Sequence, residues 1–326
     1  MTILRRQFLR LVGVAAALPF ARRIANAQTY PIRPITLVVP IAPGGAVDGA
    51  ARILSEKLQE KLQQPVVVEN RPGAGSLIGT SVVAKAAADG YTLLLMEPGA
   101  VLAKWLNKSV PFNVIEDFSP IAMVATSPVV LFAHPSTSFK NVKELISYSK
   151  MNPGKLSVGT PGIGTPHHLA AAWMNTAAGI DITHVPYRGA APALNDLLGG
   201  QVPLIWASPI AVMPFVEQGK VKVLAVSTQQ RNPSLPQVPT VSESALPGFD
   251  INIFYGVAAP AGVSSEVIAR VGQAIREVID IPEVQKRMST LGLNFDFRNH
   301  DQFRELIASD HRKYGAIVRE AGIQPD

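Results

Sequence analysis

Two glycine-rich turns each follow a short apolar stretch and precede a helical pattern. The first turn spans residues 40–48 after the apolar stretch 35–39, and the second spans residues 159–168 after the stretch 156–158. A strand that feeds a glycine turn and then a helix leaves several backbone N–H groups unpaired at the positive end of the helix dipole. Such a turn binds an anion without needing a charged side chain. Two of these turns predict one ligand with an anionic group at each end.

The first turn has two interpretations. Either the N–H groups around Gly44, Gly45 and Ala46 capture a carboxylate, or the paired glycines serve only to make a tight strand-to-helix turn. Asp48 falls in the first helical turn, where a carboxylate favours the helix dipole but would repel an anionic ligand. We therefore expect Asp48 to face the amides of its own loop.

The second turn does not match a nucleotide-binding P-loop, because Gly164-Thr165 is followed by Pro166 and no lysine. Pro166 suits the first helical position, which makes Thr165 the expected N-cap, with a hydroxyl that also meets a ligand. His167 and His168 are adjacent and point to different sides of a helix, so we predict no metal site. Near the helix N-terminus, a neutral His168 either donates a hydrogen bond to a carboxylate or packs at the edge of its lobe.

A third loop, residues 71–79, imitates a dinucleotide-binding fingerprint. Its glycine spacing is G-x-G-x-x-x-G, however, and no acid stands about 20 residues beyond it. We therefore predict no cofactor, and interpret the loop around Gly75 and Ser76 as a third anion-accepting or cleft-lining segment. Ser76 is not part of a G-x-S-x-G turn, so the sequence does not support a serine hydrolase.

The first 27 residues have the features of an export signal. A basic head containing Arg5 and Arg6 precedes an apolar run at 11–21 and an Ala-x-Ala exit at 25–27. The order Arg-Arg-x-Phe-Leu-Arg resembles a twin-arginine signal, and cleavage after Ala27 predicts a periplasmic protein. Removal of its five arginines leaves 25 basic residues against 24 acidic ones, and the formal charge falls from +6 to +1. Neither a nucleic acid nor a membrane surface is therefore implied as a partner.

The composition also limits the chemistry and the number of domains. The chain has no cysteine, which excludes disulfides, thiolate metal sites and cysteine nucleophiles. The mature chain of 299 residues is long enough to bury a sizeable core. This length predicts two domains of about 150 residues each.

Apolar strand patterns alternate with helical patterns throughout the mature chain, which predicts an α/β protein with parallel sheets covered by helices. The expected strands lie at 35–39, 65–69, 92–96, 129–133, 183–186, 204–206 and 221–226, and the short strand at 65–69 is expected to be buried.

The proline-rich stretch 229–249 is expected to form a long ordered loop. It precedes an extended stretch at 251–258, where the chain is expected to return to the first sheet, and a forward crossing is expected near 125–128. These crossings assign residues 28–127 and 253–326 to lobe 1 and residues 128–252 to lobe 2.

Motifs along the whole mature chain resemble, in order, those of the Bug-type solute receptors, the extracytoplasmic receptors of tripartite tricarboxylate transporters. They are VPIAPGGxxD at 39–48, ENRPGAG at 69–75, ADGYTLL at 88–94, HVPYRGAAPAL at 184–194, DLLGGQV at 196–202 and APAG at 259–262. The resemblance implies a two-lobed periplasmic binding protein fold (type II), with parallel or mixed sheets and a dicarboxylate-type ligand in the cleft.

Three positions depart from the pattern of the family. Ile41 stands where the family commonly has Phe or Tyr, which opens that wall of the cleft, and Ala172 replaces a frequent acid. Ala207 stands where an aspartate is often found; an acid there would suit a ligand ammonium group, so its absence argues against amino acids.

Three aromatic residues, Trp206, Phe254 and Tyr255, either offer aromatic surface to a ligand or pack in the core. Core packing is the expected role of at least one of them.

We therefore expect a periplasmic receptor that captures a small organic anion, either a di- or tricarboxylate or an aromatic carboxylate. It is expected to be a monomer that needs no cofactor and delivers its ligand to the membrane permease subunits of a tripartite tricarboxylate transporter. One alternative is a receptor that presents its ligand to a membrane sensor kinase, and a less favoured one is a hydrolase. An enzyme would need a nucleophile and base or a metal cluster, and the chain offers no convincing set. The expected ligand-binding residues are Ile41, Pro43, Gly44, Gly45, Ala46, Asp48, Gly75, Ser76, Thr160, Gly164, Thr165, His168, Arg188 and Ala207.

Overall fold

The computed structural model describes residues 30–325. The predicted export signal and its cleavage point after Ala27 lie outside these residues. Within the described part of the chain, no helix has both the length and the apolar character needed to cross a membrane.

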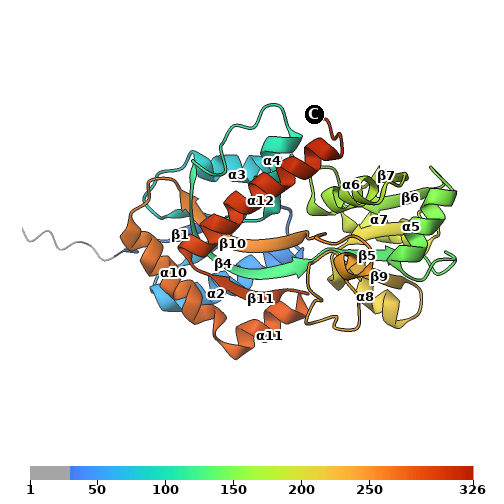
Figure 1. The fold of residues 1–326 in the computed structure, drawn as a ribbon. Coiled ribbons are helices and arrows are strands. Elements are labelled where there is room, and N and C mark those ends of the chain that lie inside the picture. The colour runs from blue at the N-terminus through green and yellow to red at the C-terminus, as the bar shows by residue number, and fades with distance from the viewer. Residues whose placement is uncertain (1–29, 326) are drawn as a thin grey trace, which may run out of the picture.

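The strands of the described chain form two separate sheets, in agreement with the predicted α/β class (Figure 1). Their bounds are β1 Ile35–Val39, β2 Val66–Asn70, β3 Thr92–Met96, β4 Phe118–Pro128, β5 Val130–Ala133, β6 Leu156–Thr160, β7 Ile182–Pro186, β8 Leu204–Ala207, β9 Lys222–Val226, β10 Asn252–Pro260 and β11 Asn294–Arg298. The first sheet has the order β11-β4-β10-β3-β1-β2, and the second has the order β7-β6-β8-β5-β9.

Helices follow most of the strands and cover both sheets. Their bounds are α2 Ala46–Leu62, α3 Leu77–Ala84, α4 Pro98–Leu106, α5 Val142–Met151, α6 Pro166–Ala178, α7 Ala190–Leu198, α8 Pro209–Glu217, α9 Val241–Ser244, α10 Ser265–Ile279, α11 Pro282–Thr290 and α12 His300–Glu320. The elements of the first sheet lie on the left of Figure 1 and those of the second on the right. Helix α12 packs on α4 and also contacts α6, which belongs to the second group.

Both sheets are mixed rather than purely parallel. Strand β1 pairs in parallel with β2 and β3, and β6 pairs in parallel with β7 and β8, as the strand–helix alternation predicts. Strands β10 and β5 run antiparallel to their neighbours, because the chain enters them from the other sheet. Strand β2 lies at the edge of the first sheet, where Val67 is 52% exposed, so its run of valines marks an edge strand and not a buried one.

The chain passes between the two sheets twice, at Val129 between β4 and β5 and along residues 227–251 between β9 and β10. Ser227, which is fully buried, joins these two passages. Its N–H donates to the Val129 carbonyl (2.8 Å) and its Oγ accepts from the Val129 N–H (3.2 Å). The Ile251 N–H donates to the Ser227 carbonyl (2.9 Å). Hydrogen bonds at Ser227 therefore join the two connections, and we refer to this contact as the Ser227 junction. No motif in the sequence indicated it.

The three aromatic residues considered as ligand surface, Trp206, Phe254 and Tyr255, are all buried among the core side chains. Trp206 lies parallel to Phe249, with ring centroids 6.3 Å apart, and Phe249 stacks in turn on Trp173. All three therefore pack in the core, as expected for at least one of them, and Phe254 also lines a cavity between β10 and α12.

Candidate ligand-binding site

The carboxyl ends of strands from both sheets surround one cavity of about 860 Å³. Its lining comes from the connections that follow β1, β2 and β3 in the first sheet and β6 and β7 in the second. Each of these connections leads directly into a helix. Open α/β sheets bind ligands at this place, because the helix N-termini gather there. We refer to this cavity as the cleft.

The predicted site residues divide into those that line the cleft and those that lie behind or beside its lining. Ile41, Gly75, Ser76, Gly164, Thr165 and Arg188 line it. Pro43, Gly44, Gly45 and Ala46 continue the β1–α2 loop beyond Ala42, the last lining residue of that loop, and Gly44 and Gly45 are exposed. Asp48, Thr160, His168 and Ala207 are buried outside the lining.

Asp48 is 4% exposed, and its carboxylate binds its own loop. The Gly44 N–H donates to Oδ2 (3.0 Å), Arg52 Nε donates to the same oxygen (2.9 Å), and Asn70 Nδ2 donates to Oδ1 (2.9 Å). Burial raises the pKa of Asp48, but these hydrogen bonds outweigh burial and hold the pKa below its usual value. The predicted structural role of Asp48 is confirmed. The Gly44 amide is therefore engaged by Asp48, which leaves the amides after Gly45 to meet a ligand.

The start of α6 is closed by Thr165, as the sequence predicts. Its Oγ1 accepts from the His168 N–H (3.3 Å) and donates to the Gly162 carbonyl (2.8 Å). The His168 ring stacks on His184, with centroids 4.4 Å apart, and His184 Nε2 lies 2.7 Å from Thr160 Oγ1. Burial, and then the neighbouring His168, lower the pKa of His184 to about 4. These contacts place His168 in a packed cluster of side chains behind the cleft wall.

His167 is also buried, and burial lowers the pKa of its ring to about 4. Its Nε2 lies 3.3 Å from Ser208 Oγ. Across the described residues, no group of three or more His, Cys, Asp or Glu side chains is arranged to hold a metal ion.

Three helix starts at the cleft, those of α2, α3 and α7, have no side-chain cap among the described residues. The N-cap residues are Gly45, Ser76 and Gly189. Ser76 and Gly189 have φ angles of 78° and 114°, and the Gly189 N–H donates to the Pro161 carbonyl (2.9 Å). Within the described chain, no side chain caps these starts, although the Leu77 N–H at the start of α3 donates to the Ala74 carbonyl (3.2 Å). Sequence reasoning missed the start of α7, although a glycine with small residues directly after a strand is the same signal as in the other turns.

Two charged side chains stand among the described residues that line the cleft, Arg188 and Glu97. Arg188 is exposed, whereas Glu97 is 8% exposed. Ser76 Oγ donates to Glu97 Oε1 (2.7 Å) and the Gly99 N–H donates to Oε2 (2.8 Å). Burial raises the pKa of Glu97, although both hydrogen bonds act in the opposite direction. Glu97 was not among the predicted site residues. The sequence feature that could have indicated it is an acid directly after a buried strand and before a Pro-Gly helix start.

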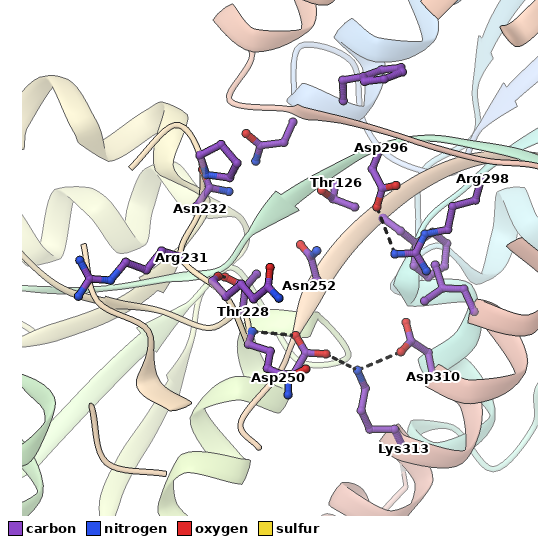
Figure 2. A pocket seen from close by; sticks show the side chains of 17 residues that line it. Thr126, Thr228, Arg231, Asn232, Asp250, Asn252, Asp296, Arg298, Asp310 and Lys313 are labelled. Carbon is purple, nitrogen blue, oxygen red and sulfur yellow. Dashed lines mark hydrogen bonds and ion pairs between the residues drawn. The ribbon is translucent and has the colours of Figure 1, made fainter. Parts of the chain in front are cut away.

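A second cavity, of about 420 Å³, lies where the 228–233 loop, β10, β11 and α12 meet. Figure 2 shows Asp250 and Asp310 pointing toward Lys313 from either side. Lys313 Nζ lies 3.3 Å from Asp250 Oδ2 and 3.0 Å from Asp310 Oδ1. Asp296 and Arg298 form a further pair at 3.2 Å. The charges around this cavity largely satisfy one another, and it lacks the uncapped helix starts of the cleft.

The family model of the tripartite tricarboxylate transporter family receptor matches residues 50–323. Among solved structures, the chain is similar to the periplasmic binding protein BugD, with 36% identity, a TM-score of 0.79, and coverage of 91% of this chain and 100% of BugD. It is similar to R. palustris Rpa4515 with adipate, at 30% identity and a TM-score of 0.82, over 91% of this chain and 100% of that one. MatC from Rhodopseudomonas palustris, with bound malate, is 31% identical, with a TM-score of 0.77 over 89% of this chain and 100% of MatC.

These similarities extend over nearly the whole described chain, including its glycine-rich connections. They identify the fold as a two-lobed periplasmic binding protein fold. They confirm the resemblance found in the sequence motifs. The chain belongs to the receptor family of the tripartite tricarboxylate transporters, a family of periplasmic solute-binding proteins rather than of enzymes.

Proposed function

We propose that this protein captures a small organic anion in the cleft and delivers it to the permease subunits of a tripartite tricarboxylate transporter. The observation that carries the proposal is the set of uncapped helix starts at a single cavity. The starts of α3 in one sheet and α7 in the other line it at Ser76 and Gly189, and the start of α2 lies just beyond the lining residue Ala42. The adipate and malate bound by two similar proteins are both small dicarboxylates, which fits this arrangement.

Backbone amides can supply the required affinity. A hydrogen bond to a charged group contributes about 1.5–3 kcal/mol, and a micromolar dissociation constant corresponds to about −8 kcal/mol. Two carboxylates that each accept from a few amides reach this range after the cost of association. Arg188, at the exposed rim, then has a secondary role.

The proposed lobes are residues 28–127 with 253–326, and residues 128–252. The two lobes form opposite walls of the cleft and are joined at the Ser227 junction. A hinge motion at this junction closes the cleft over a ligand. We further propose that residues 1–27 direct export and are removed after Ala27, which places a monomeric receptor in the periplasm.

A thermal-shift screen of the mature protein against carboxylic acids tests the proposal. A ligand at 100 times its dissociation constant adds about 2.7 kcal/mol to the free energy of unfolding. We expect at least one small di- or tricarboxylic acid, aminocarboxylic acid or aromatic carboxylic acid to raise the melting temperature in a saturable way. A complete absence of stabilisation across such a panel would contradict the proposed function.

A further inference from the structure

Glu97 is a buried carboxylic acid in the wall of the cleft. It follows β3, opens α4, and lines the cleft together with Ser76 and Gly99. A smaller adjoining cavity of about 230 Å³ shares Gly75 and Gly99 with the cleft. A ligand that fills this corner therefore lies beside the Glu97 carboxyl group.

Burial raises the pKa of Glu97, but its two hydrogen bonds act in the opposite direction and suit its ionised form. Both carboxylate oxygens accept hydrogen bonds, from Ser76 Oγ and from the Gly99 N–H, and the positive end of α4 lies next to them. Neither contact uses a proton of Glu97, so both suit a carboxylate.

No counter-ion balances this carboxylate within the described chain. None of the ion pairs among residues 30–325 includes Glu97. The charge of Glu97 also acts on the buried phenols of Tyr255 and Tyr314. Burial raises the pKa of both phenols, so they are neutral at physiological pH and cannot balance a carboxylate. A buried carboxylate is costly without an opposite charge, and here the open side faces the ligand cavity.

We propose that Glu97 binds an ammonium group of the ligand, so that the cleft selects aminocarboxylates over plain dicarboxylates. This inference rests on the proposed receptor function. The ligand carboxylate is held by the uncapped helix starts, while its ammonium group donates to Glu97 and supplies the missing positive charge. A second ligand carboxylate in the same corner would instead be repelled by Glu97.

The proposed role of Glu97 differs from an expectation drawn from the sequence, where the absence of an acid at Ala207 argued against amino acids. Ala207 is 1% exposed within β8 and does not line the cleft. The residue type at that position therefore says little about the charge of the ligand in this protein.

Calorimetry with matched pairs of probes tests the inference. The pairs are succinate with aspartate, glutarate with glutamate, and adipate with 2-aminoadipate, whose members differ by one ammonium group. For the best-bound pair, we expect the wild-type protein to bind the amino member at least tenfold more tightly. Glu97→Gln, which keeps the shape and removes the charge, should weaken the amino member at least tenfold and leave the dicarboxylate unchanged or tighter.

Glu217→Gln is the matched control, because it makes the same substitution at an exposed position at the end of α8, outside the cleft. It should retain the wild-type affinities and the preference for the amino member. Far-UV circular dichroism and a thermal melt establish that each variant is folded. If Glu97→Gln does not fold, the wild-type preference within the pairs decides alone.

Different failures are distinguishable. If the wild-type protein binds dicarboxylates as tightly as or more tightly than their amino partners, the inference is wrong while the receptor function stands. If Glu97→Gln weakens dicarboxylate binding, Glu97 acts as a neutral donor, which also overturns the inference. If no probe of either kind binds the wild-type protein, the proposed function fails and the inference fails with it.

Discussion

Gly45→Val tests whether backbone amides hold the ligand. Gly45 is the N-cap residue of α2 with φ −89°, a value that any residue adopts, and no side chain caps this start within residues 30–325. A Cβ atom added at Gly45 would meet only Ile41 Cδ1, at 4.0 Å, so the fold has room for it. Ile41 itself lines the cleft, and the branched side chain of valine would therefore stand between the first-turn amides and a ligand.

The expected loss follows from the number of amides that the valine shields. Two hydrogen bonds to a carboxylate contribute about 3–6 kcal/mol, and each 1.4 kcal/mol is a factor of ten in affinity. Calorimetry with the acid that binds best in the screen should therefore show a loss of at least about 100-fold. Arg188→Ala removes an exposed cation, whose ion pair is worth about 0–1 kcal/mol, so affinity should change less than about tenfold.

Gly199→Val is a suitable control, since Gly199 is exposed at the end of α7 and its added Cβ would approach other atoms no closer than 3.4 Å. It should bind like the wild-type protein. If Arg188→Ala abolishes binding while Gly45→Val leaves it intact, the amide account is refuted and a salt-bridge clamp should replace it.

Three further predictions concern stability and shape. Ser227→Ala leaves a buried amide without its side-chain acceptor and should lower the free energy of unfolding by about 1–3 kcal/mol in urea titrations. Ser149 is equally buried but its hydroxyl has no partner among the described residues, so Ser149→Ala should lower the free energy of unfolding less. Equal losses would contradict the stabilising role of the Ser227 junction. Because the folded-state pKa of Asp48 is lowered, its stabilisation is fully present above its ordinary pKa of 3.8 and is lost as the pH falls through the folded-state value. The stability difference between wild type and Asp48→Asn should therefore be present at pH 7 and shrink below pH 4, and a difference independent of pH would count against this role. Small-angle scattering should show a smaller radius of gyration when a ligand confirmed by calorimetry is added, and an unchanged radius would exclude hinge closure.

Local signals in the sequence were enough to predict many of the secondary elements and the local hydrogen bonds of two turns. Strand β1 and its glycine turn, and Thr165 as the cap of α6, depend on neighbours within about five residues, so the pattern contains what determines them. The same holds for Asp48, whose loop amide lies four residues away.

The parts that sequence reasoning missed depend on residues far apart in the chain. Glu97 becomes a buried cleft residue because Ser76, 21 positions away, donates to it and because β3 ends beside the β2–α3 loop. Ser227 matters only because two passages separated by about 100 residues meet at it. The sheet order that creates these meetings is not visible in a single strand, and the edge position of Val67 was missed for the same reason.

The central claim is that one ligand is held by helix starts from both sheets. It is tested most directly by following backbone amide signals of isotopically labelled protein by nuclear magnetic resonance during titration with the best-binding acid. We expect saturable shifts to be largest at Ala46 and Val47 in α2 and at Ala190 and Ala191 in α7, on opposite walls of the cleft. Saturable shifts confined to the second cavity, around Asp250 and Lys313, would contradict the account.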